Sequence, residues 1–170
     1  MTLFVHKLKR CWRHLSTTTL SGKRAFPPAS LHAIEATIEA GEKQHRAEVR
    51  WIVESSLPMQ AVLAGVTSRQ RAIDLFSIYR VWDTEENCGV LVYLNLADHK
   101  VEIIADRGIN RLVSPADWHK ICHDMSKGFA QGQFHDAGCA ALAEINALLQ
   151  SHFPAHGDRS NQLPNRPVTI

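Results

Sequence analysis

The stretch RVWDTEENCGVLVYLNLADHKVEIIADRG, residues 80–108, decides the fold predicted for this chain. Residues 90–96 are apolar on both alternating sets of side chains, as in a strand that is covered on both faces. A second run with alternating character covers residues 101–106, and the short segment between the two runs has the length of a hairpin loop. Two antiparallel strands are therefore predicted, and the first of them is central in its sheet.

Polar residues gather at one end of this predicted hairpin. Antiparallel pairing places the start of the first strand beside the end of the second, so the segment 83–87 is expected near Asp106 and Arg107. Together with Asp106, the carboxylates of Asp83, Glu85 and Glu86 could supply the oxygen ligands that Ca²⁺ or Mg²⁺ prefers, and Arg107 could hold a phosphate. The same residues also fit a solvated loop in which Asp83 caps a turn and Arg107 pairs with a neighbouring glutamate.

The composition fits a soluble globular protein of one domain. The chain has 170 residues, of which 45% are apolar and 21% charged. Its four cysteines form no CxxC pair, so they are interpreted as reduced core residues in a reducing compartment. No apolar run approaches the ~20 residues that span a bilayer, and cations interrupt the N-terminal segment, so no signal peptide is predicted. A cytoplasmic location follows, either free or peripheral to the inner membrane.

Residues 1–24 form a basic N-terminal arm. Its cations precede the first acid, Glu35, and removing these six charges from the net charge of +2 leaves −4 on the rest of the chain. Two interpretations of the arm stay open: an amphipathic helix that docks its apolar face on the domain, or one that contacts an anionic membrane or an unknown protein partner. Nucleic acid is not expected as a partner, because the rest of the chain is acidic and only one aromatic residue lies among the charges of the arm. The apolar face comprises Phe4, Leu8, Cys11, Trp12 and Leu15, and the membrane or partner contact would use Lys7, Lys9, Arg10, Trp12 and Arg13.

The remaining segments complete an α/β pattern. A helix is predicted after the PPAS segment at 27–30, a strand over 47–55, and further helices from about 72, from 115 and up to 153. A right-handed crossover makes the strand at 47–55 parallel to the first hairpin strand. Residues 25–153 should therefore form a three-layer α/β/α sandwich with a small mixed sheet, and residues 154–170 a disordered tail.

Two further clusters could carry chemistry. His119 and His123 lie one helical turn apart with Cys122 between them, which is a spacing that can hold zinc, although Cys122 also fits the apolar face of its helix. His135 and Asp136 could act as an acid–base pair, but no nucleophile stands beside them in the sequence. No phosphate-binding glycine motif and no GxSxG motif is present.

Four segments resemble the TPM domain family, which is named after a thylakoid-lumen protein, a photosystem II repair protein and a nematode acetylcholine-receptor accessory protein. NCGVLV at 87–92 is similar to the family's D-N-G-V-L segment, and DHKVEI at 98–103 to its D-x-K-V-R-I hairpin. DRGI at 106–109 stands where the family has G-Y-G, and FAQGQF at 129–134 resembles its F-x-x-G stretch. The order and spacing of the segments carry the resemblance from about residue 26 to residue 153.

The resemblance implies an α/β/α sandwich, divalent-metal binding in some members and acid phosphatase activity in plant members. This chain has Asn87 where the family has an acid, and AFPP at 25–28 replaces an Asp-rich segment. Two expected oxygen ligands are therefore missing. The resulting hypothesis is a non-catalytic interaction module that could bind a divalent cation and lie at a membrane; the alternative is a metal-assisted phosphomonoesterase.

Overall fold

The computed structural model describes residues 2–156 and 161–170, with the side chains of residues 2–4 excepted. Its centre is a mixed sheet with the strand order β3-β2-β1-β4. Neighbours β1 and β2 are parallel, and β2 and β3 form the predicted antiparallel hairpin. The strands are β1 Glu48–Glu54, β2 Gly89–Asn95, β3 Lys100–Ala105 and β4 Val168–Thr169.

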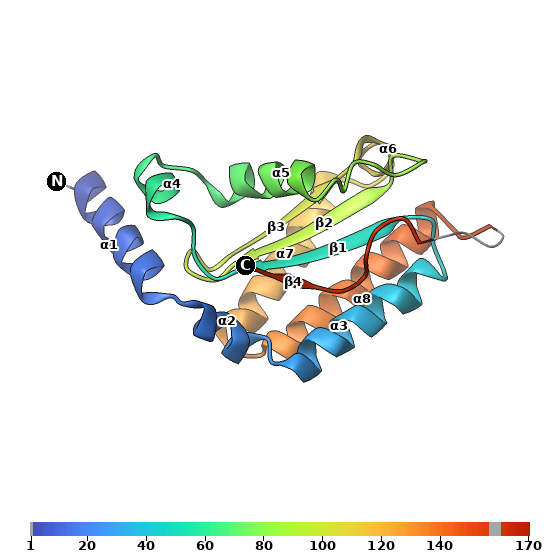
Figure 1. Cartoon of the computed structure of the whole chain (residues 1–170). Helices are drawn as coiled ribbons and strands as arrows, with labels where there is room; N and C mark the ends of the chain where they lie inside the picture. Colours follow the sequence, from blue (N-terminus) through green and yellow to red (C-terminus); the bar gives the residue numbers. More distant parts are fainter. Residues whose placement is uncertain (1, 157–160) are drawn as a thin grey trace.

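Helices cover both faces of the sheet, which confirms the three-layer α/β/α architecture. Figure 1 shows α3, α7 and α8 on one side of the sheet and α5 on the other, while α1 and α2 extend along the end where β1 and β2 finish. The helices are α1 Thr2–Ser16, α2 Thr19–Ala25, α3 Pro28–Glu42, α4 Met59–Leu63, α5 Ser68–Ile78, α6 Arg107–Asn110, α7 Pro115–Ala130 and α8 Phe134–His152. Ser114 caps α7 as predicted, accepting a hydrogen bond from the backbone N–H of Asp117 at 3.3 Å.

Burial on both faces explains the unbroken apolar run of the central strand. Val90, Val92 and Leu94 belong to the core under α3, α7 and α8. Leu91 and Tyr93 belong to the second core under α5. Every residue of β1 and β2 is buried, as expected for strands in the middle layer of a sandwich.

The expectation of a disordered tail is wrong for residues 161–170. Leu163 is buried in the core under α5, and its N–H donates to Glu48 at 3.0 Å. Arg50 donates to the carbonyl oxygens of Pro164 and Arg166, and β4 pairs with β1. The tail is ordered because the outer edge of β1 has backbone groups that need partners. Residues 157–160 lie outside the described residues.

The arm contains a second helix, α2, after α1. It begins with a capping box formed by Thr18 and Ser21. Gly22 lets α2 lie close to the end of β1, because a Cβ at this position would meet Ser55 Oγ at 2.7 Å. The arm is therefore part of the packed structure.

Candidate functional site

Two ends of the sheet gather polar side chains. The acidic end comprises residues 83–87 and 106–108, where β2 begins and β3 finishes. The turn end comprises the last residues of β1 and β2 and the β2–β3 turn, residues 96–99. In open α/β sheets, ligands usually bind beside the carboxyl ends of parallel strands, which here is the turn end.

The predicted convergence at the acidic end is confirmed. Gly108 donates its backbone N–H to Asn87 O at 3.0 Å, and Arg107 Nη2 donates to Asn87 Oδ1 at 3.4 Å. A Cβ at Gly108 would lie 2.6 Å from Asn87 O, so the two segments meet backbone to backbone. Asn87 itself has a left-handed φ of 52°, a conformation that asparagine tolerates better than most residues.

The carboxylates of Asp83, Glu86 and Asp106 at this end have separate partners. Asp83 accepts from Arg80 Nη2 at 2.6 Å, and Glu86 pairs with Arg46. Asp106 caps α6 by accepting from the backbone N–H of Arg107 at 2.6 Å, and its buried Oδ2 has no hydrogen-bond partner among the described residues. Glu85 donates its backbone N–H to Gln162 at 3.0 Å.

Across residues 2–156 and 161–170, no group of three or more His, Cys, Asp or Glu side chains is arranged to hold a metal ion. The structure thus brings Asp106 and Arg107 to the acidic loop but does not gather the four carboxylates around one point. The Ca²⁺ or Mg²⁺ site and the phosphate contact of Arg107 stay predictions.

The two histidine clusters differ in their surroundings, and His119 and His123 of the first cluster are exposed on α7. Cys122 packs against the core, and burial raises the pKa of its thiol to about 11, which disfavours the thiolate that zinc requires. His135 Nδ1 lies 3.2 Å from Ser30 Oγ. Ser30 is buried in α3, so this contact joins α8 to α3.

A buried hydrogen-bond network organises the turn end. Glu54, at the end of β1, accepts from Arg71 Nη2 of α5 and from the Tyr93 hydroxyl, both at 2.7 Å. Burial, followed by the charge and hydrogen bond of Glu54, raises the pKa of Tyr93. Asn95 donates to the Tyr93 hydroxyl at 2.9 Å and accepts from the backbone N–H of Asp98 at 2.8 Å. The network thereby fixes the position of the β2–β3 turn.

Asp98 holds α1 against this turn. Its carboxylate accepts from Arg10 Nη2 at 2.7 Å and lies 3.4 Å from Arg13 Nη2 and 3.2 Å from His14 Nε2. Burial alone would raise the pKa of Asp98, but the hydrogen bond and positive charge of Arg10 outweigh it and lower that pKa. His14 Nδ1 accepts from the backbone N–H of Leu57 at 3.0 Å.

The docked side of α1 is polar, and its apolar side faces outward. Arg10 and His14 lie one turn apart on the docked side, while Val5, Leu8, Trp12 and Leu15 form an exposed stripe on the opposite side. Leu8, Trp12 and Leu15 are 62%, 71% and 66% exposed. The interpretation that α1 docks its apolar face is therefore wrong for these residues; the side chain of Phe4 lies outside the described residues.

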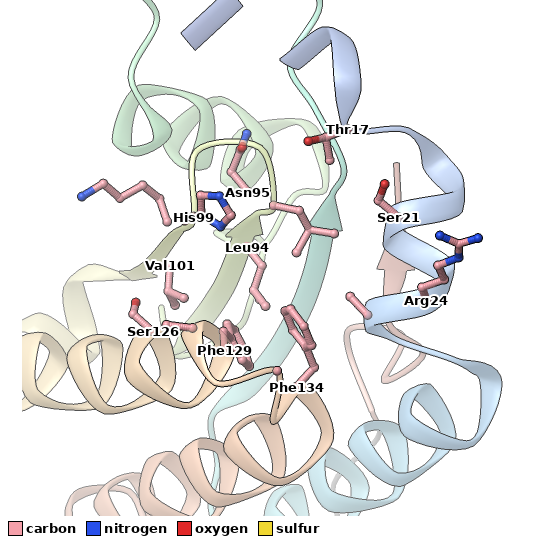
Figure 2. A pocket seen from close by; sticks show the side chains of 15 residues that line it. Thr17, Ser21, Arg24, Leu94, Asn95, His99, Val101, Ser126, Phe129 and Phe134 are labelled. Atoms are coloured by element: carbon pink, nitrogen blue, oxygen red, sulfur yellow. The ribbon is translucent and has the colours of Figure 1, made fainter. Parts of the chain in front are cut away.

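A cavity of about 540 Å³ lies at the turn end between α2, the hairpin and the end of α7. Figure 2 shows Leu94, Val101, Phe129 and Phe134 around its interior and Ser21 of α2 across from them. No sequence pattern predicted this cavity, because its lining comes from segments that are far apart in the chain. The capping pair Thr18 and Ser21 was the one local sequence signal for α2, the helix that forms one wall of the cavity.

Comparison with known proteins identifies the family. Among solved structures, the chain is similar to the NMR structure of the BA42 protein from the psychrophilic bacterium Bizionia argentinensis, with 26% identity and a TM-score of 0.73, over 84% of this chain and 93% of that one. Comparison with curated proteins finds no match. The TPM domain family model matches residues 22–148, which is most of the chain and includes the hairpin, α7 and most of α8. The chain therefore belongs to the TPM domain family.

Proposed function

We propose that this TPM-domain chain is a non-catalytic interaction module that attaches to an anionic membrane surface through α1 and presents its sandwich domain to a protein partner. The exposed stripe of Val5, Leu8, Trp12 and Leu15 carries this proposal. An ordinary surface helix buries its apolar side, whereas α1 is held by Arg10 and His14 on its polar side.

The charges of α1 fit an anionic surface. Lys7 and Lys9 lie on either side of the stripe and are exposed, and no carboxylate of the described residues lies within ion-pair distance of either. A helix with an apolar stripe between cations binds in the plane of a membrane by burying the stripe and attracting anionic headgroups. No helix among the described residues has the length and apolar character to cross a bilayer.

The domain's own groups favour binding over catalysis. No specific observation supports the phosphomonoesterase alternative, because Asp83 and Glu86 each pair with an arginine and Asp106 caps α6. The activity that we propose is therefore contact with a surface and not turnover of a phosphate ester.

Co-sedimentation with vesicles tests the proposal. The full chain should bind vesicles of phosphatidylglycerol and phosphatidylcholine in equal parts, and bind phosphatidylcholine alone more weakly. The double substitution Leu8→Ser with Trp12→Ser should weaken binding by at least about a hundredfold, because each side chain contributes roughly 1.5–3 kcal/mol when it is buried.

The matched control replaces exposed apolar residues elsewhere, Trp82→Ser with Leu112→Ser, whose side chains are 48% and 54% exposed. This control should bind as the unmodified chain does. Equal loss in both double variants, or no vesicle binding by the full chain, would show that α1 is not a membrane contact. A dimer that disappears with the α1 substitutions would identify a second copy as the occupant of the stripe instead.

A further inference from the structure

The cavity at the turn end has an apolar interior of ligand size. Its volume of about 540 Å³ is within the range of small-molecule sites, ~300–1,000 Å³. Leu94 and Val101 of the hairpin and Phe129 and Phe134 of the α7–α8 junction line it, and α2 forms the opposite wall. No Asp or Glu of the described residues lines this cavity. Its interior therefore suits an apolar chain.

A second cavity of about 640 Å³ adjoins the first, and the two share a wall made by His99, Lys100, Val101 and Ser126. The second cavity is polar and lies between β3 and α7. Further lining residues that can carry a positive charge or donate a hydrogen bond are Arg69, Trp118, His119 and His123.

The charge of the second cavity is positive on balance. Its one acidic lining residue in the described chain, Glu102, lies 3.6 Å from Arg69 Nη1. No carboxylate of the described chain lies within ion-pair distance of Lys100. The buried indole N–H of Trp118 has no acceptor among the described residues. These groups complement an anion.

We propose that the two cavities form one binding site for a single-chain amphipathic anion. The alkyl chain lies against Phe129 and Phe134 under α2, and the anionic head lies at the shared wall, where Lys100 and His99 meet it. A carboxylate and a phosphate head share this chemistry. The site is separate from the α1 stripe, so it stands or falls independently of vesicle attachment.

Calorimetric titration of the full chain with dodecanoate and with dodecyl phosphate, below their micelle concentrations, tests the proposal and distinguishes the two heads. Inorganic phosphate probes the head alone, and dodecyl glucoside, which has the same twelve-carbon chain, probes the chain alone. At least one of the anionic amphiphiles should bind, and both controls should bind at least tenfold more weakly. Amide shifts in an NMR titration should map to the β2–β3 turn, α2 and the end of α7.

Two variants locate the site. Lys100→Gln should weaken binding about tenfold, since a hydrogen bond to a charged group contributes roughly 1.5–3 kcal/mol; Lys120→Gln on the exposed side of α7 should leave it unchanged. Ser126→Trp should abolish binding, because the larger side chain would occupy the space where the two cavities meet. Lys127→Trp is its control. If Ser126→Trp fails to fold, the affinity of Lys100→Gln still tests the proposed site.

The stripe variant separates this site from α1. The chain with Leu8→Ser and Trp12→Ser should bind the anionic amphiphile that binds the unmodified chain, and with the same affinity. The proposal is overturned if no anionic amphiphile binds, if dodecyl glucoside binds as tightly, if Lys100→Gln has no effect, or if the amide shifts lie on α1 instead of the cavity.

Discussion

The acidic end and the turn end of the sheet use charged residues in opposite ways. At the acidic end, backbone contacts hold the two segments together, with Gly108 against Asn87, and the side chains of Asp83 and Glu86 form peripheral pairs. At the turn end, the buried carboxylate of Asp98 contacts Arg10, Arg13 and His14 of α1 and so holds a whole helix.

This difference shows that the density of acidic residues is a poor guide to where charge matters most. The acidic end has four carboxylates in the sequence, yet the ion pair of Asp83 is exposed and such pairs contribute little. The turn end has one aspartate at its centre, but burial makes the loss of a partner costly there. The cavities also lie toward the turn end.

The largest effect expected is at a backbone contact beside the acidic end, between Gly89 and Val81. A Cβ on Gly89 would lie 1.9 Å from the carbonyl oxygen of Val81, and a carbonyl cannot rotate away as a side chain can. Gly89→Ala should therefore lower the free energy of unfolding by about 3 kcal/mol or more. Urea denaturation measures the loss.

Gly65→Ala is the control for this variant. Gly65 has a φ of 78°, and no atom lies within 4 Å of the position that a Cβ would take there, so alanine should cost only about 1 kcal/mol of backbone strain. Equal losses of unfolding free energy in the two variants would contradict a close backbone contact between Gly89 and Val81.

The two ends should also respond to pH in opposite senses. Burial raises the pKa of Glu42, near the start of β1, to about 8, whereas Arg10 lowers that of Asp98. A raised acid pKa means that folding takes up a proton, so the contribution of Glu42 to stability should fall by about 3 kcal/mol from pH 5 to pH 8. The contribution of Asp98 should be constant over that range and be lost only as the pH falls through its lowered pKa.

Urea denaturation across this pH range separates the two groups. Subtracting the stability of Glu42→Gln from that of the unmodified chain should give a difference that declines with rising pH. The same subtraction with Asp98→Asn should give a flat line. Parallel slopes would contradict the opposite environments assigned to the two carboxylates.

The smallest effects on stability are expected from substitutions that weaken one ion pair at each end. Asp98→Asn should cost about 2 kcal/mol, because it weakens the contacts to Arg10 and His14 at a site where the Asp98 side chain is only 8% exposed. Asp83→Asn should cost no more than about 0.5 kcal/mol, since the pair with Arg80 is exposed. Hydrogen exchange should show faster exchange in α1 for Asp98→Asn alone.

Much of the fold followed from residues 80–108. Their continuous apolar run predicted a strand buried on both faces, and the positions 90–94 are indeed divided between two cores. The convergence of Asn87 with Arg107 and Gly108 also followed, because antiparallel pairing fixes it. The ordered tail was missed because the edge of β1 that orders it is a tertiary feature, and the polar sequence of residues 161–170 carries little apolar signal of its own.

The sequence by itself determined the strand pairing, the sandwich layers and the amphipathic character of α1, because alternation and helical periodicity are local properties of the chain. The tertiary structure alone decided which side of α1 is docked. Periodicity places Arg10 and His14 opposite Leu8 and Trp12, but only the position of Asp98 in a turn 84 residues beyond His14 makes the polar side the bound one. The cavities were decided in the same way, since their walls exist only where α2, the hairpin and α7 meet.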